Sequence, residues 1–463
     1  MGNTRELILD MLMEILEKGS YSHLVIRDVL DKYNYSDPRD KAFVKRVTEG
    51  TLEQLIRIDF ILDSFSKVPV SKMKPLIRNL LRMSVYQLLF MESIPARAVI
   101  NEAVKLSGKR GLKGLSGFVN GVLRNIDREK DRIPYPDREK DEVKYLSVRY
   151  SMPQWLVCKW ISDYGQEKTC RILKGLLQER PVSIRLKESL SEKEKKSWLL
   201  AMENAGVSVK AHPYLPYAYE IWGAEGIGNL PGFQEGYFAV QDVSSMLVAE
   251  ASGIAGEIKQ SEGKEANCPK EILVLDVCAA PGGKSMHIAE KLNGTGKVIA
   301  RDISEYKVSL IRDNIERMGY ANTQAQVWDA RVPDREMIGK ADLVLADLPC
   351  SGLGSMGKKR DIKYRVKEEA FGELTALQRR ILDTVWQYVK PGGVLIYSTC
   401  TINPDENEHM AEWFLENYPF ALEELSPYLS DTLKQEGKDG MLQLFPGIHE
   451  TDGFFLARLR RKV

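Results

Sequence analysis

Residues 272 to 285, ILVLDVCAAPGGKS, decide the fold of this chain. An apolar run ends in Asp276 and enters a turn of small residues from Ala279 to Gly283, and a helical pattern starts at Ser285. This order is typical of a strand, a glycine loop and a helix. In an open parallel sheet such a loop lies at the carboxyl end of a strand, where ligands bind. The stretch therefore predicts a site for a small polar cofactor.

Two familiar nucleotide-binding loops do not fit this stretch. A phosphate-binding P-loop needs glycine where Cys278 stands, and the glycine spacing differs from that of a dinucleotide fingerprint. Neither ATP nor NAD is favoured. On these residues alone, a tight turn in some other α/β fold stays open.

Four further strands are predicted downstream, each with a polar residue at its carboxyl end. The acid Asp302 closes the first, where an open α/β fold places a carboxylate against ribose hydroxyls. Chemistry-bearing side chains thus gather at one edge of a parallel sheet. The predicted strands are Lys297 to Asp302, Gln324 to Asp329, Asp342 to Asp347, and Val394 to Thr399 followed by Cys400.

Three of these segments together resemble a known family. The sequences DVCAAPGGKS from Asp276, DLPCSG from Asp347 and YSTCT from Tyr397, with Glu406 and Asn407 shortly after, are similar to the signature motifs of RNA cytosine-C5 methyltransferases. The resemblance spans roughly the last half of the chain. It implies an α/β, Rossmann-like class I methyltransferase domain that uses S-adenosylmethionine.

The resemblance also implies which residues bind this cofactor. The glycine loop wraps the methionine part, Asp302 binds the ribose, Asp329 binds the adenine amine, and Asp347 lies where the cofactor and the base meet. The loop residues are Cys278, Ala279, Ala280, Pro281, Gly282, Gly283 and Lys284.

The chemistry of cytosine methylation calls for a thiol. Carbon 5 of cytosine is a weak nucleophile, so a thiolate must first add at carbon 6 and later leave. Cys350 and Cys400 both follow predicted strands. DNA methyltransferases attack with the cysteine of a Pro-Cys pair, which would nominate Cys350, whereas the RNA family attacks with the second cysteine. We therefore expect Cys400 to be the nucleophile, Cys350 to serve product release, and Asp347 to hydrogen-bond the base.

The amino-terminal part is predicted to be helical and basic. Residues 1–130 show helical spacing of apolar residues, and residues 81–126 resemble the NusB-like RNA-binding helical domain. Residues 1–150 hold 27 Lys and Arg against 21 Asp and Glu. Residues 67–124 hold 11 basic and two acidic side chains, which favours RNA contact over a merely solvated face. A docking surface for protein stays an alternative.

The remaining boundaries follow from composition. We predict an all-α domain at 1–130, a linker at 131–150, a small α+β bridging segment at 151–235 and a catalytic domain at 236–463. Residues 252–271 are expected to form a surface loop, and Arg185 is read as an exposed strand residue or an RNA contact. The basic, glycine-rich stretch 354–365 is expected to be a mobile flap over the RNA backbone.

These features together predict an enzyme of the cell interior. The 463 residues contain six cysteines without regular spacing and no apolar run of membrane-spanning length, so we expect a cytoplasmic protein without a metal site. The pairing of a NusB-like domain with these motifs resembles the RsmB/Sun/Fmu family, which implies methylation of one cytosine in 16S ribosomal RNA, single-stranded or in a hairpin loop. The alternatives are a tRNA or 23S rRNA methyltransferase, or an inactive RNA-binding assembly factor. A monomer is expected.

Overall fold

The computed structural model describes residues 4–32, 38–224, 226–256 and 272–463, and it divides into two compact units. The helical unit contains residues 1–177 and 356–366, and the catalytic unit contains residues 178–355 and 367–463. Most of the loop expected at 252–271 lies outside the described residues.

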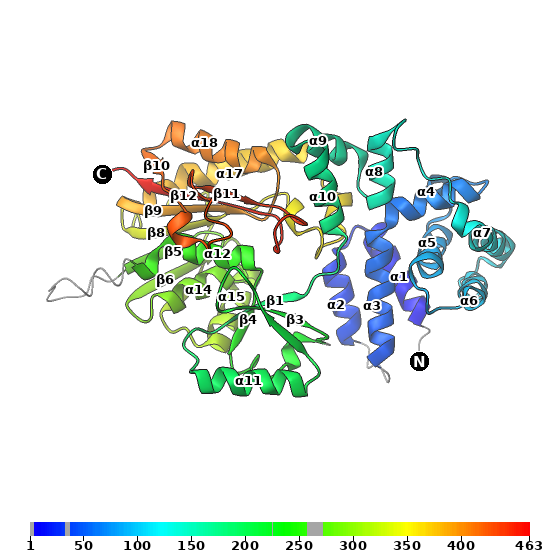
Figure 1. The fold of residues 1–463 in the computed structure, drawn as a ribbon, viewed down its shortest axis with the longest axis horizontal. Coiled ribbons are helices and arrows are strands. Elements are labelled where there is room, and N and C mark those ends of the chain that lie inside the picture. The colour runs from blue at the N-terminus through cyan, green and yellow to red at the C-terminus, as the bar shows by residue number, and fades with distance from the viewer. Residues whose placement is uncertain (1–3, 33–37, 225, 257–271) are drawn as a thin grey trace. The chain divides into compact units, whose positions relative to one another are not determined.

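The helical unit is built around α5 (Pro75–Phe90), in which every residue from Asn79 to Gln87 is buried, polar and apolar alike. A run of nine consecutive buried residues leaves no side of the helix in solvent, and α5 packs against helices from before and after it in the chain. The expected helical character of the first 130 residues is confirmed for the described part (Figure 1). The helices packed against α5 are α1 (Thr4–Leu16), α3 (Pro38–Glu53), α4 (Leu55–Phe65), α6 (Ala96–Lys109) and α7 (Ser116–Glu129), and α2 (Ser22–Lys32) packs against α1 and α3. Short 3-10 turns lie at Val70–Lys72, Lys113–Leu115 and Lys130–Arg132.

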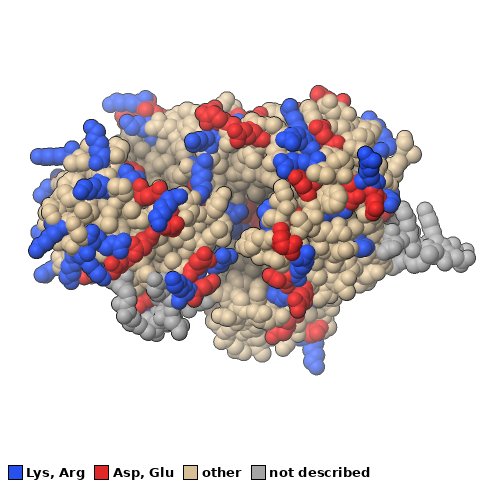
Figure 2. All heavy atoms as spheres, turned by 180° about the vertical axis from the view of Figure 1, so that it is seen from behind, with Lys and Arg blue, Asp and Glu red and all other residues tan. Residues whose placement is uncertain are grey.

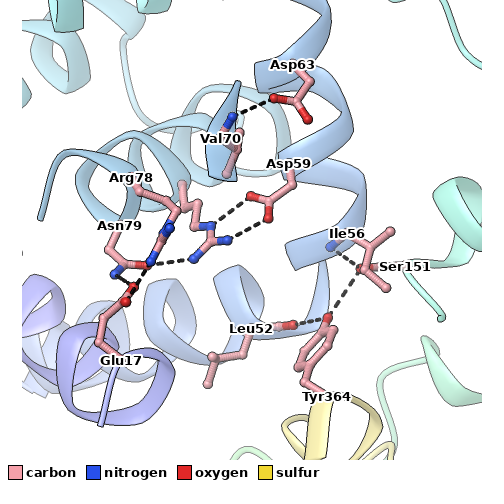
Figure 3. A network of polar contacts seen from close by, with 11 residues as sticks. Glu17, Leu52, Ile56, Asp59, Asp63, Val70, Arg78, Asn79, Ser151 and Tyr364 are labelled. Atoms are coloured by element: carbon pink, nitrogen blue, oxygen red, sulfur yellow. Dashed lines mark hydrogen bonds and ion pairs between the residues drawn. The ribbon is translucent and has the colours of Figure 1, made fainter. Parts of the chain in front are cut away.

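Polar side chains inside the helical unit tie α5 to its neighbours (Figure 3). Arg82 donates two hydrogen bonds, of 2.7 and 2.6 Å, to the carboxylate of Asp59 on α4. Arg78 and Asn79 donate to Glu17 just beyond α1, at 2.6 and 2.7 Å. Two of the basic residues that the sequence offered for RNA contact therefore serve the fold instead.

Three more helices complete the helical unit: α8 (Glu142–Tyr150), α9 (Gln154–Tyr164) and α10 (Gln166–Leu176). Helix α8 lies inside the stretch expected to be a linker. Its first turn is capped by Asp141, whose side chain accepts from the backbone N–H of Lys144 at 2.9 Å. The domain boundaries drawn from the sequence stay predictions.

The catalytic unit begins with a small antiparallel sheet in the order β2-β3-β1-β4. Trp198 and Met202 of α11 (Glu192–Asn204) form a common core with Ile184 and Phe238 of this sheet. The strands are β1 (Val182–Leu186), β2 (Ser208–Ala211), β3 (Ala218–Trp222) and β4 (Phe238–Val240), and a 3-10 turn covers Ile227–Asn229.

The large sheet has the order β10-β12-β9-β8-β5-β6-β7, with β11 paired to β12. Strands β5 to β9 run parallel, whereas β10, β11 and β12 pair antiparallel. The bounds are β5 (Ile272–Asp276), β6 (Gly296–Asp302), β7 (Thr323–Val327), β8 (Ala341–Asp347), β9 (Val389–Thr399), β10 (Phe420–Leu422), β11 (Met441–Leu444) and β12 (Phe454–Arg461).

Helices cover both faces of this sheet (Figure 1). Val274 and Leu343 share one core with α12 and α14, while the next residues along each strand, Leu275 and Val344, share another core with α17 and α18. Strands buried on both faces need such near-continuous apolar runs. The helices are α12 (Val243–Ser252), α14 (Gly283–Lys291), α15 (Glu305–Met318), α17 (Ala370–Val385) and α18 (Glu408–Asn417), with 3-10 turns at Leu353–Ser355, Trp386–Tyr388, Pro404–Glu406 and Ser426–Tyr428.

The order of the parallel strands reverses between β5 and β8, which places a binding crevice at their carboxyl ends. The expected α/β, Rossmann-like methyltransferase fold behind an all-α domain and a small α+β segment is confirmed. Strand β9 starts five residues earlier than expected, since a bulge absorbs the Pro391-Gly392-Gly393 turn opposite β8.

One segment far along the sequence belongs to the helical unit. Residues 360–365, here called the anchored segment, include the short helix α16 (Ile362–Arg365). Lys363 is buried and donates to the carbonyl oxygens of Glu53 and Ser151 at 2.7 and 2.6 Å. Tyr364 donates to the carbonyl oxygen of Leu52 at 2.7 Å (Figure 3).

The two ends of the anchored segment are held as well. Asp361 accepts from the backbone N–H and the hydroxyl of Ser22, where α2 begins, at 3.2 and 2.5 Å. Arg365 donates to the carbonyl oxygens of Gly19 and Ser20. The expectation of a mobile flap over residues 354–365 is wrong for this half, because helix ends of the helical unit bind it. Lys358 and Lys359, just before it, are exposed.

Candidate active site

The glycine loop joins the end of β5 to the start of α14. Gly282 has φ of 102°, and a Cβ there would lie 2.7 Å from the Met286 side chain, so glycine is required. Asp276 is buried and accepts a hydrogen bond of 2.6 Å from Ser285 in the first turn of α14. Burial raises the pKa of Asp276 to about 7. Asp276 therefore fixes the glycine loop through Ser285, and it is not among the residues that line the cavity described next.

A cavity of roughly 330 Å³ opens at the carboxyl ends of β5, β6, β8 and β9. It collects polar and apolar side chains from all the loops that the sequence singled out. Among the predicted site residues, those that line the cavity are Cys278, Ala280, Asp302, Asp329, Asp347, Cys350 and Cys400. The predicted residues outside its lining are Ala279, Pro281, Gly282, Gly283 and Lys284.

Asp302, at the end of β6, is positioned by the loops around it. Its side chain accepts from the backbone N–H groups of Ala280 and Ile303 at 3.0 and 2.8 Å. Lys307 lies 3.0 Å from the same carboxylate and also lines the cavity. The carboxylate thus has a fixed direction and a nearby cation.

The sequence predicted Asp329 as the last residue of a strand. In the structure β7 ends at Val327, and Asp329 lies two residues further on. Arg331 binds its carboxylate through the backbone N–H at 2.9 Å and the guanidinium at 2.6 to 3.1 Å. The hydrogen bonds from Arg331 lower the pKa of Asp329. The sequence did not single out Lys307 or Arg331, because neither belongs to a motif.

The two cysteines meet across adjacent strands. Strands β8 and β9 pair in parallel with Asp347 opposite Ser398. The sulfur atoms of Cys350 and Cys400 lie 3.4 Å apart, and both residues line the cavity. The hydrogen bond with Cys400, and then burial, raise the pKa of Cys350 well above its ordinary value.

Asp347 lies beside this sulfur pair with both oxygens engaged. One accepts from Lys284 at 2.7 Å and the other from Ser398 at 2.9 Å. Burial would lower the pKa of Lys284, but the charge of Asp347 outweighs it and raises the pKa. Lys284, expected against the cofactor, therefore points towards Asp347.

Two buried polar residues behind the cysteines had no predicted role. Glu406 and Asn407 follow the YSTCT motif, and each binds one of the cysteine loops. Gln378 of α17 donates to the carbonyl oxygen of Pro349 at 2.9 Å. In the part of the chain that the structure describes, no three His, Cys, Asp or Glu side chains are grouped so as to hold a metal ion.

The basic character of the helical unit concentrates on exposed side chains (Figure 2). We call six of them the basic face: Arg97, Lys105, Lys109, Lys113, Arg124 and Arg128, all on α6, α7 and the turn between them. Arg185, by contrast, is fully buried in β1 and binds Gln241 at 3.0 Å and Glu290. Both readings of Arg185, as an exposed residue and as an RNA contact, are wrong because its strand is covered on that side.

Comparison with known proteins finds a match for each of three successive parts of the chain. The 16S rRNA methyltransferase RsmB/F family matches residues 266–460, the NusB family matches residues 2–128, and the ferredoxin-like domain of RsmF/B-like methyltransferases matches residues 152–224. A probable ribosomal RNA small subunit methyltransferase B of Bacillus subtilis is 35% identical and is covered over 99% of both chains. The chain belongs to the RsmB/F methyltransferase family.

Other RsmB/F relatives and solved structures agree. A probable ribosomal RNA small subunit methyltransferase B of Synechocystis is 31% identical over 100% of both chains. The crystal structure of PH0851 covers 99% of both chains at 26% identity, with a TM-score of 0.78. A methyltransferase homolog from Pyrococcus horikoshii is 25% identical with a TM-score of 0.54, covering 69% of this chain and 99% of its own. No helix among the described residues is long and apolar enough to cross a bilayer.

Proposed function

We propose that this chain transfers a methyl group from S-adenosylmethionine to carbon 5 of a cytosine in 16S ribosomal RNA, with Cys400 as the nucleophile. The observation that carries the proposal is the pair of sulfurs, 3.4 Å apart on adjacent strand ends beside Asp347. Two thiols at this separation can both reach one pyrimidine ring. The relatives named above as small subunit methyltransferases support ribosomal RNA as the substrate.

The cavity residues fit S-adenosylmethionine. Asp302, held by two backbone N–H groups, suits ribose hydroxyls, and Asp329, which lines the same cavity, suits the adenine amine. The glycine loop from Cys278 to Gly283 offers the small residues that let a backbone approach the methionine end. When bound, S-adenosylmethionine supplies an electrophilic methyl group. Lys284 holds Asp347 in this proposal.

Addition to the base begins at Cys400. Its thiolate forms a bond to carbon 6, the double bond between carbons 5 and 6 breaks, and the ring becomes enamine-like. Two thiolates 3.4 Å apart would repel each other, so one sulfur keeps its proton while the other attacks. The resemblance to the RNA family assigns the attack to Cys400. Asp347, oriented by Lys284 and Ser398, hydrogen-bonds ring nitrogen 3 or the exocyclic amine as charge moves there.

Release needs a base on the same side of the ring. Once Cys400 is bonded to carbon 6 it carries no charge, so Cys350 can lose its proton to solvent. After methylation the Cys350 thiolate takes the hydrogen of carbon 5 as a proton, and the electrons of that carbon–hydrogen bond re-form the double bond between carbons 5 and 6. The bond between carbon 6 and sulfur breaks, and its electron pair returns to Cys400. Cys350 is the nearest group of suitable chemistry, at 3.4 Å from the Cys400 sulfur. We assign it to this step.

The RNA substrate has to present an unstacked cytosine, because a paired base cannot accept a thiol at carbon 6. The basic face of the helical unit supplies positive charge for the RNA backbone. A single-stranded or hairpin-loop cytosine fits these demands, and the enzyme acts as a monomer in the cytoplasm.

Methyl transfer tests the proposal directly. Wild type should transfer labelled methyl groups to naked 16S RNA or to small ribosomal subunits, whereas Cys400→Ala should transfer none. Cys350→Ala should accumulate a covalent complex with RNA, and 5-fluorocytosine RNA should be trapped on wild type through Cys400. Transfer only to tRNA or 23S RNA would refute the substrate, and no transfer to any RNA would favour an inactive binding factor.

A further inference from the structure

Two adjacent buried residues reach both cysteine loops from behind. Glu406 ends the 3-10 turn Pro404–Glu406, and Asn407 precedes α18. Both are fully buried. Their side chains do not line the cavity, so contact with cofactor or base is not their task.

Glu406 receives hydrogen bonds from the loop that carries Cys350. Its carboxyl group accepts from the backbone N–H of Ser351 at 2.8 Å and from the Ser351 hydroxyl at 2.5 Å. Gln378 donates to the same carboxyl group at 3.2 Å and to the carbonyl oxygen of Pro349 at 2.9 Å. The residues on both sides of Cys350 are therefore fixed through Glu406 and Gln378.

Asn407 brackets Cys400 in the same manner. Its side-chain oxygen accepts from the Thr399 hydroxyl at 2.5 Å, and its side-chain N–H group donates to the carbonyl oxygen of Thr401 at 3.1 Å. The amide also donates to Gln443 of β11 at 2.6 Å. Both neighbours of Cys400 are held by one side chain.

Hydrogen bonds also join the two loops to each other, and one of them reaches Glu406. The hydroxyls of Ser351 and Thr401 lie 2.7 Å apart, and the Ser351 hydroxyl donates onward to Glu406. A shift of either loop is thus transmitted to the other. Since the sulfurs are 3.4 Å apart, a displacement of one ångström would change their relation to a shared base substantially.

We infer that Glu406 and Asn407 are positioning residues that set the two sulfurs for separate steps, Asn407 for the attack by Cys400 and Glu406 for the release by Cys350. This inference rests on the proposed function, because it presumes that the two cysteines act in succession on one cytosine. It assigns different kinetic defects to two neighbouring residues of equal burial.

Matched substitutions separate the two roles. Glu406→Gln keeps the volume but turns one acceptor into a donor that faces the Ser351 N–H. We expect the covalent complex with ordinary RNA to form at nearly the wild-type rate and to break down about 10-fold to 100-fold more slowly. Asn407→Asp loses the donor to Thr401 and Gln443, and it should slow formation of the complex by a similar factor while breakdown of the complex changes little.

The controls lie on the exposed side of α18. Glu416→Gln and Asn417→Asp make the same chemical changes on exposed residues and should leave both rates unchanged. Gln378→Met removes the hydrogen bonds to Pro349 and to the Glu406 carboxyl group but leaves the bonds from Ser351 to Glu406 in place. It should reproduce the slow release, and it serves if Glu406→Gln does not fold. Thermal melting and binding of S-adenosylmethionine to each variant are measured alongside.

The outcomes are distinct. Slow release in Glu406→Gln together with slow attack in Asn407→Asp supports the inference, and equal slowing of both steps in both variants, or no change in either, overturns it. If wild type itself forms no covalent complex and transfers no methyl group, the proposed function fails, whatever the variants do.

Discussion

Two basic stretches of this chain look alike in the sequence and have opposite fates in the structure. The basic face on α6 and α7 keeps its charged groups in solvent, whereas in the anchored segment Lys363 is buried and Arg365 is bound to backbone carbonyls. The difference lies in what surrounds each cation. Helix ends offer carbonyl oxygens that lack partners inside the helix, and the anchored segment meets several of them. A basic residue in the sequence therefore indicates RNA contact only when the structure leaves its side chain in solvent and no helix end accepts its hydrogen bonds.

The largest expected effect is on RNA binding by the basic face. Replacing Arg97, Lys113 and Arg124 by Glu should weaken binding of 16S RNA about 100-fold at moderate salt, because phosphate contacts are lost. The slope of the logarithm of the binding constant against the logarithm of the salt concentration should become shallower by about two to three. The affinity is measured by filter binding across a salt series. The control replaces three exposed lysines of the catalytic unit by Glu: Lys297, Lys340 and Lys438. Equal losses in both triples would refute a dedicated face.

The next effect is on stability and concerns the anchored segment. Lys363→Met leaves the carbonyl oxygens of Glu53 and Ser151 buried without this donor, which should lower the free energy of unfolding of the helical unit by about 2 kcal/mol. Amide hydrogen exchange in α3 and α8 measures the loss. The exposed neighbour gives the control, since Lys359→Met should change nothing. A weaker affinity for RNA with unchanged exchange would restore the flap hypothesis for Lys363.

A smaller effect is expected where Asp361 meets α2. Its carboxylate accepts from the N–H and hydroxyl of Ser22 in the first turn, so Asp361→Ala should destabilise α2 by about 1 kcal/mol, as the loss of a helix cap does. Exchange protection in α2 should fall, and protection in α6 and α7 should not. Uniform loss over all helices would mean that the contact supports the whole unit and not one helix end.

The smallest effect is the pH dependence of the same contact. Burial alone would raise the pKa of Asp361, but hydrogen bonds from Ser22 and the charge of Arg365 outweigh it and lower the pKa. A carboxyl group with a lowered pKa in the folded state stabilises above its unfolded pKa and loses this contribution as the pH falls through the folded value. The difference in stability between wild type and Asp361→Asn should therefore shrink below about pH 4, the usual range of aspartate. A difference that stays constant down to pH 2 would contradict this origin.

Local patterns predicted most of the catalytic unit. The apolar runs of β5, β6, β8 and β9 are continuous because both faces are buried, and the parallel topology brings their ends together. Both cysteines were expected at strand ends, and the pairing of β8 with β9 in the structure brings their sulfurs together. These inferences needed only residues near in sequence and one topological rule.

Long-range partners escaped prediction. Lys363 and its acceptors Glu53 and Ser151 are 310 and 212 residues apart, and nothing in the local sequence marks a carbonyl oxygen as needing a donor. The direction of Lys284 towards Asp347 and the burial of Arg185 also depend on neighbours from other elements. Glu406 and Asn407 were visible as a motif, but their contacts with two loops required coordinates.

The placement of the anchored segment has a bearing on how such proteins can be recombined. The chain crosses from one unit to the other after residue 177 and again on either side of residues 356–366. The helical unit therefore cannot be replaced by that of a relative through a single junction in the sequence. A chimera joined at residue 177 would combine the helices of another protein with the anchored segment of this one. The side chains of Asp361, Lys363 and Arg365 would then lack the helix ends that they bind here. A chimera should fold only when residues 356–366 are replaced together with residues 1–177.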